Sequence, residues 1–287
     1  MKDKSRYIIL PEVWDELSEA DWRELLKFRQ QLISKGMKAT LDDVRIWTAR
    51  MMLKNRGVKQ QTGNSQYLVL VSQLAGSLDW LWQEVDGGLS LVYRSSKNLL
   101  PKIQRGTEKG HQEWIGPLSH GADMTFGEFR QAISHLKVYE QQQEPTALCA
   151  LAGLLYRPKA TLQQKQEQQL LRQPYDWDSL DDKIERGRQM KPWQVWGIYA
   201  WFAFFCEYLT TGIFTIEGED VCFAPVFGVS GNGRKESGGG MAQICLTLAE
   251  SHVFGTAKEV DRTPLLTVML KLLQDYQTLQ KLKNRKV

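Results

Sequence analysis

The stretch ALCALAGLLYRP, residues 147–158, decides how the second half of this chain folds. It begins as a run of small and apolar residues, which suits a helix that is buried on all sides. Pro145 precedes it in the first turn, where proline is tolerated, and Pro158 disfavours helical backbone at the residue before it. The sequence therefore predicts a buried helix that stops at Tyr156-Arg157-Pro158.

The closing triplet is predicted to form a structural corner. Arg157 lies in the last turn, where a cation suits the negative end of the helix dipole, and it can also pair with a carboxylate such as those at 176–182. Tyr156 can bury its ring against the aromatic helix expected at 193–205, while its hydroxyl finds a polar partner.

Helical periodicity recurs on both sides of this stretch. Thr125-x-x-Glu128 has the spacing of a capping box and predicts a helix start. A strand is expected at 89–96, followed by a long irregular connection rich in Gly and Pro. The fold class is mostly α, a multi-helix globular bundle with at most one short β element. Helices are expected at about 19–35, 41–54, 67–82, 126–140, 146–155, 179–189, 193–206, 241–255 and 264–282.

A change of texture near residue 122 suggests two parts. Residues 1–121 form an N-terminal helical segment with the irregular connection, and residues 122–287 form a second helical domain. Within the latter, 161–173 is rich in glutamine and reads as an exposed loop or solvated helix. Residues 228–240 read as a flexible glycine-rich insert, since Lys235 is followed by Glu236 and the phosphate-loop pattern fails.

Composition argues against several classes of protein. The formal net charge is only +4, and the basic residues gather only at the C-terminal end, so nucleic-acid binding is not favoured. Four scattered cysteines lack the spacing of a zinc site, and no cofactor is expected. The apolar runs at the N-terminus and at 193–206 are too short for a signal peptide or a membrane span, so a cytoplasmic location is expected.

Two clusters invite a functional interpretation. Asp176–Asp182 is an acidic cluster that could supply oxygen ligands to a metal ion, although the calcium-loop pattern fails and helix capping by Asp178 or Ser179 explains it better. The tryptophans Trp193, Trp196 and Trp201 lie on the apolar helix, where they are either core residues or a surface for a partner.

Four short segments stand out by their order along the chain: Asn98–Pro101, Met124–Phe129, Leu154–Pro158 and 240–255. This series resembles a family of proteins encoded in the tail modules of tailed bacteriophages and prophages, notably those of Bacteroidetes. In that family a T-x-G-E-[FY] helix start is followed by an apolar helix ending in LYRP, a hydrophobic helix, and GM…LAE…FG. The segments 161–173 and 228–240 depart from the family, and residues 1–85 match it less clearly.

The resemblance implies a non-enzymatic tail assembly factor, chaperone-like or a minor tail component, that acts through protein–protein contacts. Its partners would be phage tail proteins such as the tape-measure protein, and it would act in the host cytoplasm during virion assembly. The family pattern falls on Thr125, Glu128, Tyr156, Arg157 and Pro158 as structural motif residues. Two alternatives stay open: a metal-dependent enzyme that uses Asp176–Asp182, and a weak nucleic-acid-binding protein.

Overall fold

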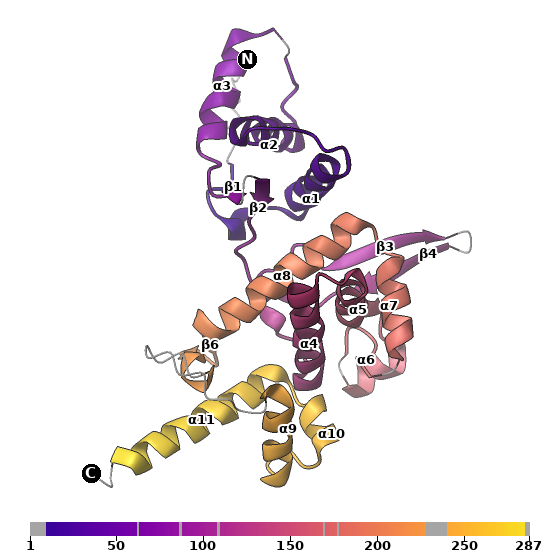
Figure 1. Ribbon diagram of the computed structural model, residues 1–287, viewed down its shortest axis with the longest axis vertical. Coiled ribbons are helices and arrows are strands. Elements are labelled where there is room, and N and C mark those ends of the chain that lie inside the picture. Colours follow the sequence, from indigo (N-terminus) through magenta and orange to yellow (C-terminus); the bar gives the residue numbers. More distant parts are fainter. Residues whose placement is uncertain are drawn as a thin grey trace, which may run out of the picture. The chain divides into compact units, whose positions relative to one another are not determined.

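The computed structural model describes residues 10–61, 63–85, 88–107, 110–168, 170–176, 178–227 and 240–284, and it is mostly helical, as expected (Figure 1). The chain divides into two compact units. Unit 1 comprises Met1–Ser95 with Pro192–Gly197, and unit 2 comprises Ser96–Lys191 with Ile198–Val287. The boundary expected near residue 122 falls inside unit 2. Residues 228–239 of the expected glycine-rich insert lie outside the described residues.

Unit 1 packs three helices and a hairpin around aromatic side chains. Ser18 and Thr40 cap the first two helices, because their hydroxyls accept hydrogen bonds from Asp21 N at 3.1 Å and Asp43 N at 3.2 Å. Trp22 is buried at the centre, in ring contact with Trp14. The elements are η1 (Trp14–Glu16), α1 (Glu19–Ser34), α2 (Leu41–Asn55), α3 (Ser65–Gly76), β1 (Trp82–Val85), β2 (Gly88–Leu91) and the first residues of α8 (Pro192–Thr211).

Unit 2 holds the motif segments and is built on a layer of helices beside a small sheet (Figure 1). Its α-helices are α4 (Phe126–Gln142), α5 (Pro145–Leu155), α6 (Leu162–Gln168), α7 (Leu180–Arg188), the remainder of α8, α9 (Gly240–Glu250), α10 (Ala257–Arg262) and α11 (Leu265–Asn284). Its strands and 3-10 turns are β3 (Lys102–Thr107), β4 (Gly110–Ile115), η2 (Ser119–Gly121), β5 (Arg157–Pro158), β6 (Ile213–Ile216), β7 (Glu219–Cys222) and η3 (Ala224–Phe227).

The expectation of at most one short β element is wrong. Antiparallel pairing joins β1 to β2, β3 to β4 to β5, and β6 to β7. The segment read as an irregular connection contains the β3–β4 hairpin, in which buried Ile103 lies opposite buried Trp114. The third helix ends at Gly76 rather than near residue 82, and Trp82 pairs with Leu91 in the first hairpin. Strands this short carry too few alternations to stand out in sequence.

Helices α5 and α7 approach each other at two glycines. A Cβ atom on Gly153 of α5 would overlap the backbone carbonyl of Lys183, and one on Gly187 of α7 would overlap that of Cys149. Arg186 Nη1 also donates to Gly153 O at 2.5 Å, so the same contact carries a hydrogen bond. The small residues noted in 147–158 therefore serve close helix packing.

The apolar helix expected at 193–206 is α8, and it contributes Phe202 and Phe205 to the core of unit 2. Within the described ranges, no helix combines the length and apolar character that crossing a bilayer would require.

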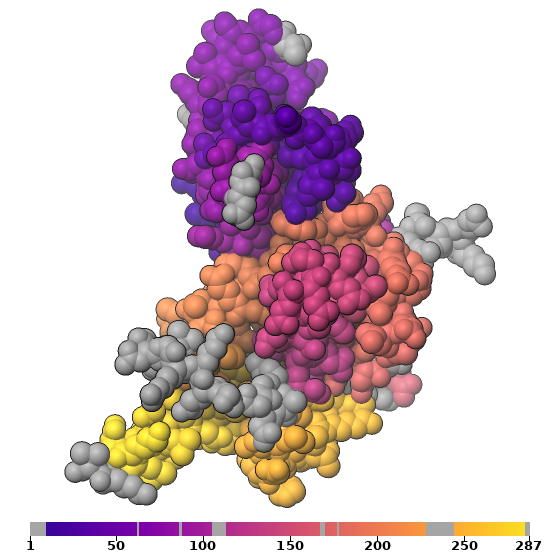
Figure 2. Space-filling model, viewed as in Figure 1, coloured from indigo at the N-terminus to yellow at the C-terminus, as the bar shows by residue number. Residues whose placement is uncertain are grey.

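The last turns of α11 are exposed at Leu279 and Leu282 (yellow in Figure 2).

Candidate functional site

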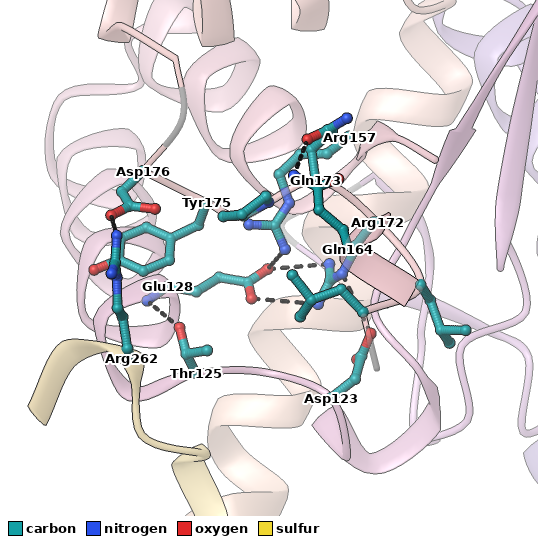
Figure 3. A pocket seen from close by; sticks show the side chains of 13 residues that line it. Asp123, Thr125, Glu128, Arg157, Gln164, Arg172, Gln173, Tyr175, Asp176 and Arg262 are labelled. Carbon is teal, nitrogen blue, oxygen red and sulfur yellow. Dashed lines mark hydrogen bonds and ion pairs between the residues drawn. The ribbon is translucent and has the colours of Figure 1, made fainter. Parts of the chain in front are cut away.

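The motif residues Thr125, Glu128 and Arg157 come together inside unit 2. Thr125 Oγ1 accepts a hydrogen bond from Glu128 N at 3.3 Å and so caps α4, as the sequence predicts. The Glu128 carboxylate does not complete the capping box. It points inward, where it meets two arginines (Figure 3).

One buried carboxylate serves two buried guanidinium groups. Arg157 Nη2 donates to Glu128 Oε1 at 3.0 Å, and Arg172 binds both carboxylate oxygens, with Nη1 3.0 Å from Oε1 and Nη2 3.3 Å from Oε2. The three side chains are only 1% to 4% exposed. Arg172 Nε also lies 3.3 Å from Asp123 Oδ2, which supplies a second negative charge.

Backbone pairing brings the two arginines together. Helix α5 ends at Leu155, and β5 then pairs Arg157 with Ile115 of β4. On the other side of this segment, Lys159 forms a β-bridge with Arg172, and Gln173 N donates to Pro158 O at 2.9 Å. The LYRP ending thus passes from helix to strand, and its strand positions Arg172 beside Arg157.

The expected partner of Arg157 was a carboxylate at 176–182, and the structure shows Glu128 instead. Asp176 pairs with Arg262 at 3.1 Å, and Asp178 pairs with Arg186. Sequence reasoning missed Arg172 because it lies in the glutamine-rich segment read as exposed. The only local signal was the neighbouring pair Leu170-Leu171.

Tyr156 and Pro158 complete the motif. The Tyr156 hydroxyl donates to Leu100 O at 2.5 Å and lies 3.2 Å from Asn98 Oδ1, so two motif segments meet at one phenol. A Cβ atom on Gly116 would overlap the Tyr156 ring, which is buried. Pro158 lies opposite Trp114 in the β4–β5 pairing. The polar residues of the motif are therefore engaged in the interior of unit 2.

A cavity of about 420 Å³ lies beside the Glu128–arginine cluster. Figure 3 shows Glu128 among the side chains that line it, between Arg157 and Arg172. Burial lowers the pKa of Arg157 to about 10, with Glu128 opposing the shift. Burial also raises the pKa of Tyr175 above its ordinary range, so both groups stay protonated at neutral pH. The other lining residues are Asp123, Thr125, Gln164, Leu170, Leu171, Gln173, Pro174, Asp176 and Arg262.

The acidic cluster is distributed over structural contacts. Ser179 and Asp182 form a capping box at the start of α7, which confirms the capping interpretation. Asp178 is buried beside Lys183 and Arg186. In the part of the chain that the structure describes, no three His, Cys, Asp or Glu side chains gather so that they could hold a metal ion.

The three tryptophans singled out from the sequence occupy two environments. Trp193 and Trp196 are partly exposed in unit 1, where the Lys27 ammonium lies 5.8 Å from the Trp193 ring centroid and the Arg29 guanidinium 3.6 Å from that of Trp196. Trp201 is buried in unit 2, stacks on Phe205, and donates from Nε1 to Ser96 O at 3.1 Å.

The chain matches no protein-family model, no curated protein and no solved structure. The resemblance to tail-module proteins therefore stays a prediction from the order of the short motifs.

Proposed function

We propose that this protein is a non-enzymatic assembly factor or minor component of a bacteriophage or prophage tail, acting through protein–protein contacts. The observation that carries the proposal is that the motif residues meet at one buried framework. Glu128 holds Arg157, and Tyr156 holds the Asn98–Pro101 segment through Leu100. Residues used in this way maintain a shape, which is what a binding protein needs, and they leave the outer surface free to carry specificity.

The surface that suits a partner lies in unit 1. Trp193 and Trp196 remain partly exposed, and Lys27 and Arg29 lie over their rings. Tryptophan and arginine are the residue types that most often dominate binding energy at protein interfaces. This patch, defined here as the Trp–Arg patch (Lys27, Arg29, Trp193 and Trp196), favours a partner with an acidic, partly apolar face.

The partner would be a tail protein such as the tape-measure product, met in the host cytoplasm during virion assembly. A tape-measure gene next to the gene for this chain would support the assignment. The decisive experiment is a co-expression pull-down of the full chain with each product of the neighbouring tail genes. Retention of one product would support the proposal, and retention of none would overturn it.

The Trp–Arg patch is tested in the same pull-down with paired alanine variants. Trp193→Ala with Trp196→Ala should lower recovery of the partner at least tenfold, because two anchoring rings are lost. Leu162→Ala is the matched control, since Leu162 is 79% exposed and lies elsewhere, on α6. Equal loss of partner in both variants would refute the assignment of the patch.

A further inference from the structure

Two neighbouring buried arginines differ in how completely their N–H groups are satisfied. Arg172 has partners at all three nitrogens: Asp123 at Nε, Leu155 O and Glu128 at Nη1, and Glu128 at Nη2. Arg157 bonds Glu128 through Nη2, whereas its Nε and Nη1 are buried without a hydrogen-bond partner among the described residues. Arg157 therefore has N–H groups left for an acceptor that the described residues do not supply.

A buried guanidinium with unpaired N–H groups destabilises the folded protein, because these groups lose their hydrogen bonds to water and form none within the protein. The cost is removed when a negatively charged acceptor joins them, and charge-assisted bonds of this kind are the strong ones. Arg157 lines the cavity of about 420 Å³ described above, which lies within the size range of small-molecule sites.

The cavity has the mixed lining of a ligand site. Gln164 and Gln173 offer amide groups, and their side chains hydrogen-bond each other at 2.9 Å. Leu170, Leu171 and Pro174 supply apolar surface. Because the Nε and Nη1 atoms of Arg157 are closed to water, an entering ligand must rearrange side chains near Arg157 to reach them.

We infer that this cavity binds a small organic monocarboxylate, whose carboxylate accepts hydrogen bonds from the unpartnered N–H groups of Arg157. A planar carboxylate matches the guanidinium, and its single charge suits a site that already contains negative groups. Asp123, Glu128 and Asp176 also line the cavity and balance the charges of Arg157, Arg172 and Arg262, so a monocarboxylate adds one negative charge to this set and a doubly ionised phosphate would add two. The inference concerns a site separate from the Trp–Arg patch, so either can fail without the other.

The test follows the Nε–H signal of Arg157 in the full-length protein labelled with ¹⁵N-arginine. Sodium acetate and sodium butyrate are titrated at constant ionic strength, with sodium chloride and inorganic phosphate as comparison anions. The expected result is a saturable shift of the Arg157 signal with the carboxylates. The Arg130 signal should stay in place, because its Nε already donates to Asp261 at 3.2 Å. No shift with either carboxylate, or an equal shift with chloride or phosphate, overturns the inference.

A pair of variants checks that the ligand occupies the cavity. Leu171→Trp adds bulk at a lining residue that is 44% exposed, so the change should fold and should weaken carboxylate binding at least tenfold. Leu162→Trp adds the same bulk outside the cavity lining and should bind as the unaltered protein does. Equal binding by the two variants would overturn the placement, and Arg157→Lys identifies the Arg157 signal by its disappearance.

Discussion

Glu128 and Arg157 form a buried ion pair at 3.0 Å across 29 residues of sequence. Glu128 lies in the first turn of α4, and Arg157 lies in the short strand that follows α5. Since Arg172 binds the same carboxylate, Glu128 is the shared ion-pair partner of two guanidinium groups in the interior. The stability of unit 2 should therefore depend strongly on this carboxylate.

Glu128→Gln should lower the free energy of unfolding by about 3–5 kcal/mol, because breaking a buried pair leaves charge without compensation. Urea denaturation measures it. Glu24→Gln is the matched control, since Glu24 pairs with Lys27 at 2.6 Å but both side chains are more than 40% exposed. The control should change stability by at most ~1 kcal/mol. Similar losses in both variants would contradict the central place given to Glu128.

Arg157→Ala should lower the melting temperature, but less than Arg172→Ala does. Among the residues that the structure describes, Arg172 bonds Glu128, Asp123 and Leu155 O, whereas Arg157 bonds only Glu128. We expect a loss of about 1–3 kcal/mol for Arg157→Ala and about 3–5 kcal/mol for Arg172→Ala. Calorimetry of the two variants checks the order, and a melting temperature unchanged by Arg157→Ala would reject the structural-corner interpretation.

Gly153→Ala should destabilise unit 2 by roughly 2 kcal/mol or more, because the new methyl group would overlap the Lys183 carbonyl and push α5 from α7. Gly76→Ala serves as the control. Gly76 is the last residue of α3, and an added Cβ would have no atom within 4 Å. Alanine at this position should therefore leave the free energy of unfolding unchanged or raise it by less than about 1 kcal/mol. Equal shifts of the denaturation midpoint in Gly153→Ala and Gly76→Ala would show that the close approach of α5 and α7 is not the cause of the destabilisation.

Stability should fall as the pH drops below about 6.5, in part through His135. Burial, with a smaller contribution from the nearby Lys183 charge, lowers the pKa of His135. Below the ordinary histidine pKa the unfolded chain binds a proton that the folded protein resists, so folding loses free energy as the medium becomes more acidic. His135→Gln should flatten this part of the stability–pH curve between pH 7 and pH 5. An unaltered slope in the variant would assign the effect to other groups.

Local features of the fold could be predicted from the sequence. Capping at Ser18, Thr40, Thr125 and Ser179 places helix starts correctly, because a cap involves residues only three positions apart. The end of α5 before Pro158 follows from the same kind of short-range steric rule.

Features that join distant segments could not be predicted. The sequence suggests a partner for Arg157 at 176–182, but the partner is Glu128, because the β5 pairing rather than the spacing decides which carboxylate Arg157 reaches. The sequence predicts that residues 161–173 are exposed because the segment is rich in glutamine. This average property does not reveal that one of its residues, Arg172, is buried. The strand expected at 89–96 corresponds to β2 (Gly88–Leu91), but its partner β1 and the other two sheets are not predicted, because each strand is stabilised by a partner strand that the local pattern does not contain.

The two stretches that form unit 1 have a consequence for how the chain is made. Trp196 lies 6.4 Å from Trp22, ring to ring, yet it is synthesised long after the rest of the unit. At roughly 5–20 residues per second, a ribosome needs about 5–20 s to pass from Ser95 to Pro192. During that interval Trp22 and Arg29 lack their contacts with Trp196, which has not yet been synthesised, while the sequences of α4, α5 and α7 are being made. We therefore expect unit 1 to begin folding first and to be completed only when the start of α8 has left the ribosome.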